Sequence, residues 1–175
     1  MGVMVTPDRL AALFKAYHVP LVRFLTRRLG DRDWAEELAQ ETFVRALKQD
    51  EIASERSWLF AVASNLVRDE ARREARERKR HEVMRVQAEA ESSVEPEPTS
   101  IERAEDRALA RQAIEMLAER DRDALLMREE GLGYEEIAEA LGLSVASVGT
   151  TLSRARRRLM EAYESLQQER SAERA

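Results

Sequence analysis

The chain contains no cysteine, and this absence excludes disulfide bonds, thiolate metal sites and cysteine nucleophiles together. It has only two histidines, His18 and His81, which lie far apart in the sequence and therefore do not indicate a metal site. Aromatic residues make up only 5% of the chain, whereas Ala, Leu, Glu and Arg dominate. This composition favours an all-α protein.

Long hydrophobic runs are also missing, since no segment approaches the length of a membrane span. The first six residues lack the basic and hydrophobic parts of a signal peptide. Met1, Gly2 and Thr6 fit the loose pattern for myristoylation, but nothing polybasic follows closely to support it. We therefore expect a soluble cytoplasmic protein that does not insert into a membrane.

Motifs of catalysis are absent as well. The sequence shows no Ser-His-Asp set, no Gly-rich phosphate loop and no cluster of metal-ligating residues. We expect a protein that works by binding, with no catalytic residues, no metal, no cofactor and no small-molecule substrate.

The charge distribution is more informative than the net charge of −5, which argues against an indiscriminate nucleic-acid binder. Residues 68–80 hold seven Arg or Lys against four acids, and residues 154–158 hold four Arg. Between them, residues 89–106 hold seven acids against one Arg. Two basic segments separated by an acidic one suggest two contact sites joined by a spacer.

The segment 133–159 predicts two short helices joined by a tight turn. Gly142 is placed to end the first helix with a positive φ, and Ser144 is placed to cap the second. Apolar residues follow helical spacing on both sides of this turn. The first stripe consists of Leu132, Ile137, Ala138 and Leu141, and the second begins with Val145, Val148 and Leu152. This pattern is typical of a helix-turn-helix.

Two interpretations of this segment remain open. It could be a plain αα-hairpin of a helical bundle, because small residues at turns are common. It could instead bind DNA, with its second helix in the major groove. The second interpretation is favoured by four arginines that could meet phosphates, Arg154, Arg156, Arg157 and Arg158.

Three helices are expected in the N-terminal part of the chain. The first begins after Thr6, is broken or kinked at Pro20 and ends at Gly30. The second starts at a capping-box-like pair, Asp33 and Glu36, and runs to about residue 48, with its acidic residues largely off its apolar face. The third is capped by Ser57 and runs to about residue 80, its first half apolar and its second half basic.

The middle and end of the chain complete the outline. Residues 87–100 contain two prolines, several acids and no apolar periodicity, so we predict a disordered linker. Helical pattern resumes near Ile101, and Asp121 is expected to cap a further helix. The chain is expected to fray beyond Leu166. One apolar stripe of this part comprises Leu109, Ala113, Met116 and Leu117.

Three stretches together resemble the sigma-70 family of bacterial transcription initiation factors, specifically its small extracytoplasmic-function (ECF) group. AEELAQETFVRAL, residues 35–47, resembles the core-polymerase-binding helix of that family. SWLFAVASNLVRDEARR, residues 57–73, is similar to its helix for melting and reading the minus-ten element. Residues 125–159 resemble its minus-thirty-five-reading module. The likeness covers about residues 10–166.

The resemblance implies a fold and a division of the chain. The fold class is all-α, with two small helical domains joined by a flexible acidic linker and a helix-turn-helix in the second domain. Residues 1–82 would form the region-two domain, 83–104 the linker, 105–166 the region-four domain and 167–175 a polar tail. The implied partners are core RNA polymerase and promoter DNA, and an anti-sigma factor is left open as a further partner.

The resemblance also implies site residues. Residues facing the polymerase would be Glu36, Glu37, Gln40, Glu41 and Thr42. Residues at the melted minus-ten element would be Trp58 and Asn65, with Arg68, Arg72 and Arg73 along its backbone. Minus-thirty-five contacts would come from Ser144, Val145, Ala146, Ser147, Gly149, Thr150 and Thr151, with Arg154, Arg156 and Arg157 on phosphates.

The chain departs from the family pattern at a few positions. Ala61 and Ser64 replace residues that are often basic, and Gly149 and Thr151 stand where Lys and Arg are common. Two rivals remain beside a sigma factor: a stand-alone helix-turn-helix regulator with a sensing or dimerisation domain, and a helical adaptor that binds only protein. Residues 35–47 argue against both, because neither needs an acidic helix for docking on polymerase.

Overall fold

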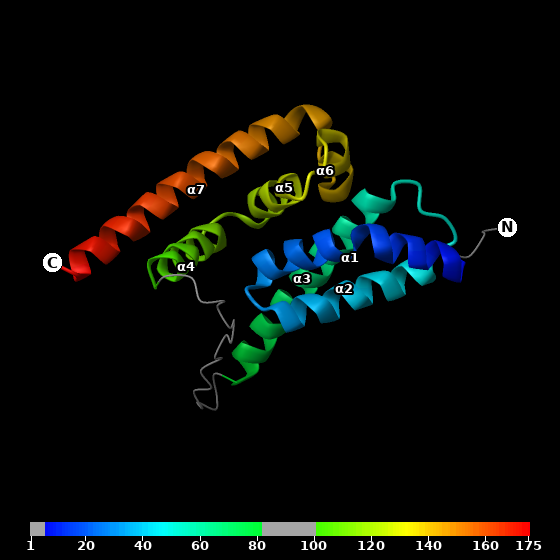
Figure 1. The fold of residues 1–175 in the computed structure, drawn as a ribbon, viewed down its shortest axis with the longest axis horizontal. Coiled ribbons are helices and arrows are strands. Elements are labelled where there is room, and N and C mark those ends of the chain that lie inside the picture. The colour runs from blue at the N-terminus through cyan, green and yellow to red at the C-terminus, as the bar shows by residue number, and fades with distance from the viewer. Residues whose placement is uncertain (1–5, 82–100) are drawn as a thin grey trace. The chain divides into compact units, whose positions relative to one another are not determined.

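The computed structural model describes residues 6–81 and 101–175, and every regular element in these ranges is an α-helix. The chain divides into two compact units, Met1–Val94 and Glu95–Ala175. We call residues 6–81 the first unit and residues 101–175 the second unit (Figure 1). The expected all-α architecture with two small helical domains is confirmed. The predicted linker, residues 87–100, lies outside the described residues.

The first unit consists of α1 (Pro7–Leu29), α2 (Arg32–Leu47) and α3 (Glu55–His81). Thr6 caps α1 by accepting a hydrogen bond from the Arg9 amide at 3.3 Å, and Gly30 ends the helix with a φ of 75°. Helix α1 continues through Pro20, so the expected break at this residue does not occur. Leu21, Phe24 and Leu25 directly after the proline are fully buried, and this burial offsets the missing backbone hydrogen bond.

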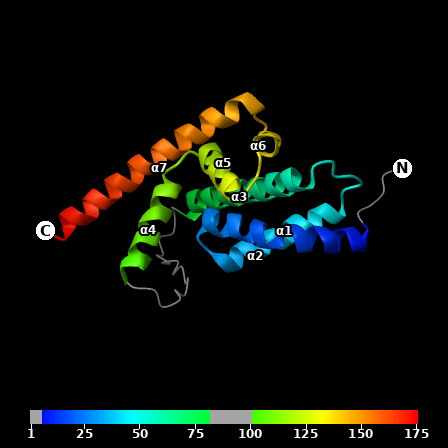
Figure 2. The same ribbon diagram turned by 45° about the horizontal axis from the view of Figure 1, so that its top comes forward.

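Helices α1 and α2 lie side by side and share the most extensive contact of the first unit (Figures 1 and 2). Small side chains allow this approach, since Ala35, Ala39 and Ala46 of α2 are fully buried. The N-cap of α2 is Asp31, whose carboxylate accepts from the Trp34 amide at 3.0 Å. The expectation that Asp33 begins the helix was therefore wrong by two residues.

Helix α3 also begins earlier than expected. It starts at Glu55, and the Trp58 amide donates to the Ser54 carbonyl at 2.9 Å. Ser57 is buried inside the first turn, so it is not the cap that we predicted. Leu59, Phe60 and Ala63 point into the core with no exposed surface.

The second unit consists of α4 (Ile101–Glu115), α5 (Glu119–Glu129), α6 (Tyr134–Leu141) and α7 (Val145–Glu173). Within it α7 packs on each of the other three helices. Ala118 occupies the N-cap position of α5, and Asp121 lies in the first turn as a fully buried side chain, so the prediction that Asp121 caps this helix was wrong. Met116 was expected in the core but is exposed, whereas Leu117 is buried.

The helix-turn-helix formed by α6 and α7 agrees with the sequence analysis. Gly142 has a φ of 64° and the next amide, that of Leu143, donates to the Ala138 carbonyl at 2.8 Å. Ser144 caps α7 by accepting from the Ser147 amide at 3.2 Å. The predicted apolar stripes supply the core of this motif, with Ile137, Val148 and Leu152 fully buried. Val145 is the exception, because it is 48% exposed at the start of α7.

The end of α7 differs from the expected polar tail. The helix continues to Glu173, well beyond Leu166. Three ion pairs connect this end to α4: Arg170 with Glu105 at 3.6 Å, Arg170 with Asp106 at 3.5 Å, and Arg174 with Glu105 at 2.8 Å. Polar composition here reflects pairing between two helices, which local periodicity could not reveal.

Candidate polymerase and nucleic-acid interfaces

Helix α2 exposes a face that combines acidic and apolar side chains. Glu37 and Gln40 are exposed, and Glu41 is half-buried beside Arg45, which donates to its carboxylate at 2.9 Å. Val44 lies one turn after Gln40 and Glu41 and is 44% exposed. We call Glu37, Gln40, Glu41 and Val44 the α2 surface. An apolar centre with a polar rim is the usual anatomy of a protein–protein interface.

Sequence reasoning missed part of this surface and included a residue that does not belong to it. Val44 was missed, although its helical spacing from Glu37 and Gln40 could have found it. Thr42 is fully buried, and its hydroxyl donates to the Leu38 carbonyl at 2.8 Å. Thr42 therefore packs inside the first unit and cannot contact a partner at the surface.

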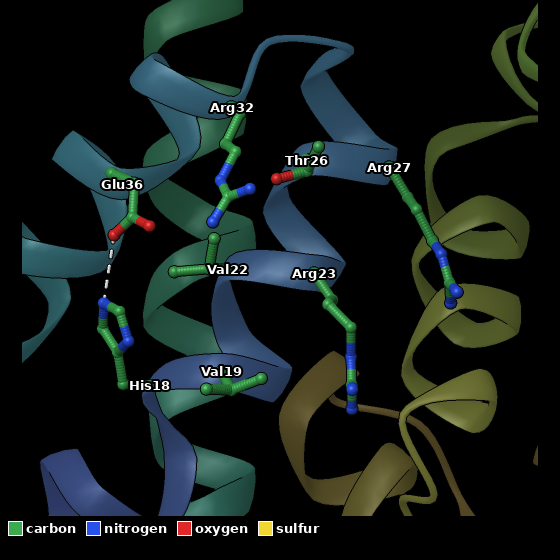
Figure 3. A pocket seen from close by; sticks show the side chains of 8 residues that line it. All are labelled: His18, Val19, Val22, Arg23, Thr26, Arg27, Arg32 and Glu36. Carbon is green, nitrogen blue, oxygen red and sulfur yellow. Dashed lines mark hydrogen bonds and ion pairs between the residues drawn. The ribbon is translucent and has the colours of Figure 1, made fainter. Parts of the chain in front are cut away.

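Glu36 lies at the side of the α2 surface and is paired. Its carboxylate is 3.0 Å from His18 Nε2, and both side chains are partly exposed. The pair borders a pocket of about 310 Å³ between α1 and the first half of α2. Figure 3 shows Arg23 and Arg27 extending in parallel from α1 and the Glu36–His18 pair on the other side. The full lining is His18, Val19, Val22, Arg23, Thr26, Arg27, Arg32 and Glu36.

One face of α3 carries most of the residues expected at the minus-ten element. Trp58, Asn65 and Arg72 are spaced by seven residues, which places them in one row along the helix. Trp58 is half-buried, whereas Asn65 and Arg72 are exposed. An aromatic ring, an amide and a cation in one row can stack on a base, hydrogen-bond to its edge and pair with a phosphate.

The other two α3 cations expected at the minus-ten element are Arg68 and Arg73, and each contacts a side chain of its own helix. Arg68 donates to the Ser64 hydroxyl at 3.1 Å, and Arg73 pairs with Glu77 at 3.3 Å. Ser64, one of the positions that depart from the family pattern, is thus buried and holds an arginine of the same helix. Exposed pairs of the Arg73 type are weak and exchange readily for a phosphate.

The first turns of α7 present a second candidate surface. Ala146, Thr150 and Arg157 are exposed and share one face of the helix, with Ser147 beside it. Ser144 and Val145 are exposed at the start of the helix, where backbone amides and the helix dipole favour an anion. Thr151 is buried at 5% exposure, so it cannot contact a base in this arrangement.

Gly149 lies on the neighbouring side of α7, close to the ring of Tyr134. A β-carbon at Gly149 would lie 3.6 Å from Tyr134 Cε2, an ordinary van der Waals distance. The Arg128 guanidinium lies 5.7 Å from the centre of the same ring, within the range of a cation–π contact. A tyrosine ring therefore flanks the position at which the family commonly has a basic residue, and an arginine contacts that ring.

Arg154 is not a free cation, in contrast to the expectation from the sequence. Its Nε donates to Asp121 Oδ2 at 2.9 Å and its Nη2 donates to Asp121 Oδ1. Arg158 reaches the same carboxylate at 3.4 Å. The hydrogen bond from Arg154 holds the pKa of Asp121 below its ordinary value against the opposing effect of burial, and the charges of Arg154, Arg158 and Arg120 act in the same direction. Arg156 and Arg157 are exposed.

The described parts of the chain offer little for other chemistry. In residues 6–81 and 101–175 we find no group of three His, Cys, Asp or Glu that could hold a metal ion. Among the same residues, no helix is both long and apolar enough to cross a membrane.

Comparisons with known proteins agree on one family. The family model for Sigma-70 region 2 matches residues 13–77, and the model for Sigma-70, region 4, matches residues 107–159. The chain is 30% identical over 154 residues to the RNA polymerase sigma factor YlaC of Bacillus subtilis, covering 85% of this chain and 88% of that one. It is 34% identical over 158 residues to the ECF RNA polymerase sigma factor SigL of Mycobacterium tuberculosis, covering 85% of both chains.

A solved structure is similar over most of the chain. The sigma factor RpoE, in its complex with the anti-sigma factor NepR from Bartonella quintana, aligns with a TM-score of 0.65 and 25% identity. The alignment covers 90% of this chain and 95% of that one.

The chain belongs to the sigma-70 family of RNA polymerase sigma factors. Within that family it is a factor of the ECF group. It binds core RNA polymerase and promoter DNA and directs transcription initiation. The resemblance stated from three stretches of sequence is thereby confirmed, and the two rival interpretations are set aside.

Proposed function

We propose that the α2 surface is the part of the first unit that binds core RNA polymerase. The observation that carries this proposal is that Val44 is exposed on the same face as Glu37, Gln40 and Glu41, on a helix whose opposite face is buried. Glu36 would contribute at the edge, where a partner would have to compete with His18 for its carboxylate. The complementary partner surface would be basic around an apolar depression.

The two DNA contacts divide by mechanism in this proposal. Trp58 and Asn65 of α3 would hold unpaired bases of the minus-ten element, while Arg68, Arg72 and Arg73 follow the phosphates of the opened strand. Ala146, Ser147 and Thr150 at the start of α7 would contact base edges of the minus-thirty-five element. Arg156 and Arg157 would meet the backbone. Ser144 and Val145 would lie where the helix N-terminus approaches a phosphate.

Charge reversal on α2 tests the polymerase contact. We expect Glu37→Lys with Glu41→Lys to weaken binding of the full chain to core polymerase by at least about tenfold, because like charges would then face each other across the interface. Asp50→Lys with Glu51→Lys is the matched control, since it makes the same charge change at exposed positions of the loop between α2 and α3.

Fluorescence titration of labelled protein with core enzyme measures both variants, and circular dichroism checks that both remain folded. Equal affinity of the α2 double variant and the wild-type chain would refute the assignment of this surface. If both double variants weaken polymerase binding equally, the effect comes from overall charge and not from the α2 surface.

The comparisons and the described helices also support three broader proposals. The protein acts by binding alone, as expected of a sigma factor, without catalysis of its own. It works in the cytoplasm, where the polymerase is. It has an anti-sigma factor as a regulatory partner, since a similar sigma factor was solved in complex with one. Co-purification of the tagged chain from its native cell, followed by inhibition of run-off transcription by the recovered partner, tests the last of these.

A further inference from the structure

A carboxylate is buried against the first half of α7, where it contacts Arg154 and Arg158. Asp121 is 1% exposed and lies on α5, thirty-three residues before the arginine that binds it. Removing a carboxylate from water costs several kcal/mol unless cations and hydrogen bonds replace the solvent. The two arginines that contact the carboxylate come from α7, so most of the compensation depends on where α7 places Arg154 and Arg158.

The geometry of this cluster leaves part of each arginine available. Arg154 binds both carboxylate oxygens through Nε and Nη2, which form one edge of the planar guanidinium. The contacts to Asp121 do not involve Nη1, which is the outer corner of the same group. The arginine side chains are 38% and 49% exposed, although the carboxylate between them is not. A held guanidinium with an open edge can bind a second anion without losing further side-chain freedom.

Their place on α7 puts these arginines beside the proposed DNA face. Arg154 lies seven residues after Ser147 and four before Arg158, so all three follow one side of the helix. Seven residues correspond to about 10 Å along the axis. Side chains at that distance from the start of a recognition helix meet the phosphates that border the groove.

We propose that Asp121 is a positioning residue for DNA binding, which holds Arg154 and Arg158 so that their outer N–H groups meet backbone phosphates beside the minus-thirty-five element. This inference rests on the proposed placement of α7 on DNA. It assigns a role in binding to a side chain that cannot itself touch DNA. A buried ion pair that only stabilised the fold could be replaced by apolar residues at little cost, with no need for exposed guanidinium edges.

Neutralising Asp121 distinguishes positioning from a change in overall charge, because the two predict opposite effects on DNA affinity. Asp121→Asn removes a negative charge close to DNA, so a change in overall charge alone would tighten binding. Loss of positioning weakens it, because the two arginines then sample many conformations. We expect holoenzyme made with this variant to bind about tenfold more weakly to a duplex that the wild-type holoenzyme selected from a random-sequence pool. Asp106→Asn is the matched control, since it removes a carboxylate paired with Arg170 at the far end of α7.

The salt dependence of binding separates positioning from stability. We expect Asp121→Asn to reduce the slope of log K against log salt by about one, as Arg154→Ala does, and the double variant to lose little more. Arg154→Lys keeps the charge but lacks the planar fork, so it should also weaken binding. Circular dichroism establishes that each variant is folded before it is measured.

Unchanged or tighter binding by Asp121→Asn, with the fold intact, would overturn the inference. If Asp121→Asn does not fold, Arg154→Lys decides the question: unchanged affinity and slope would overturn the inference, and weaker binding would support it. Failure of the wild-type holoenzyme to select any duplex would instead contradict the proposed DNA contacts of α7. The two failures are therefore distinguishable.

Discussion

The two units bury polar side chains of different kinds. In the described residues of the first unit these are hydroxyls, whereas the second unit also buries carboxylates. A hydroxyl can be satisfied inside its own helix, as Thr42 is by the Leu38 carbonyl four residues earlier. A carboxylate needs a cation, and for Asp121 that cation comes from another helix. The residues concerned are Thr42, Ser57 and Ser64 in the first unit and Asp121, Asp123, Glu130 and Thr151 in the second.

The DNA-facing helices show the same contrast. Two cations of α3 beyond its packed half pair within their own helix, Arg73 with Glu77 at 3.3 Å and Arg78 with Glu74 at 3.7 Å. On α7, Arg154 and Arg158 belong to the packed half and connect α7 to α5. A buried charge cluster therefore helps to position the second DNA-binding helix, whereas the first is held by apolar packing and a partly exposed ion pair, Arg9 with Glu55 at 3.0 Å. Four predictions test this difference between the units.

The largest effect is expected when Asp121 loses its main partner. Arg154→Ala leaves a buried carboxylate with only the Arg158 contact and the charge of Arg120. We expect the second unit to lose about 3 kcal/mol of stability, the lower end for a broken buried pair because Arg154 is partly exposed. Both tryptophans, Trp34 and Trp58, lie in the first unit, so their fluorescence follows that unit alone.

Urea unfolding of the full chain can be monitored by circular dichroism and by tryptophan fluorescence. We expect the unfolding midpoint of the Arg154→Ala variant to shift in circular dichroism and not in fluorescence. Arg156→Ala is the control, because Arg156 is exposed on the same helix and should cost little. A parallel shift of the tryptophan signal would mean that the two units do not differ in the way proposed.

Acid should affect the second unit through the same carboxylate. The pKa of Asp121 is lowered in the folded state, chiefly by the hydrogen bond from Arg154. Its contribution to stability is therefore present above the ordinary aspartate pKa of about 4 and is lost as pH falls toward and through the lower folded value. Between about pH 5 and pH 2 we expect the wild-type chain to lose more stability than Asp121→Asn does. Urea unfolding at a series of pH values measures the stability of both proteins. If the wild-type chain and Asp121→Asn lose stability in parallel, Asp121 is not the cause of the acid sensitivity.

Local signals in the sequence predicted the helices and the turn between α6 and α7 well. Gly142 and Ser144 were identified because a left-handed residue and an N-cap each leave a mark on neighbouring residues. The apolar stripes around them were correct except at Val145, since helical period determines which side chains share a face. The family resemblance then supplied the order of the two units.

Long-range pairing is what the sequence could not reveal. Asp121 was assigned as a cap because an acid near a helix start has that local meaning, yet its partner lies thirty-three residues away. The end of α7 was expected to fray because Arg170 and Arg174 looked solvated, although they pair with Glu105 on α4. Burial of Thr42 and Thr151 depends on which helix packs opposite them. None of these facts follows from the period of a single helix.

In the first unit, transcription should depend on the side chains of α3 that bind unpaired bases and not on its ion pairs. Trp58→Ala and Asn65→Ala are expected to reduce run-off transcription from a fully paired promoter by about tenfold, equivalent to the 1–3 kcal/mol that base–aromatic stacking contributes. A template already mismatched at the minus-ten element should show a much smaller loss, because its bases need no unstacking. Asn65→Ala serves as the check on Trp58→Ala, since Asn65 is exposed and its loss should leave the fold unchanged. Equal losses on both templates would refute a role in strand opening.

The smallest effect concerns two glycines of the helix-turn-helix, which should respond to alanine with opposite signs. Gly149 lies within α7, and a β-carbon there meets only an ordinary contact with Tyr134, so Gly149→Ala should stabilise the second unit by up to about 1 kcal/mol. Gly142 has a φ of 64°, which strains any other residue, so Gly142→Ala should destabilise it by about 1 kcal/mol. Gly30, with a φ of 75°, provides the equivalent substitution at the end of α1.

Circular dichroism should register all three alanine variants, and tryptophan fluorescence only Gly30→Ala, because each unit responds to its own backbone. Destabilisation by Gly149→Ala would show that the contact with the Tyr134 ring is tighter than an ordinary van der Waals contact at 3.6 Å. The side of α7 that faces Tyr134 would then be as tightly determined as the side that Asp121 holds. Stabilisation would leave Asp121 as the contact that constrains the helix, and it would show that glycine at this position costs stability without being required by the fold.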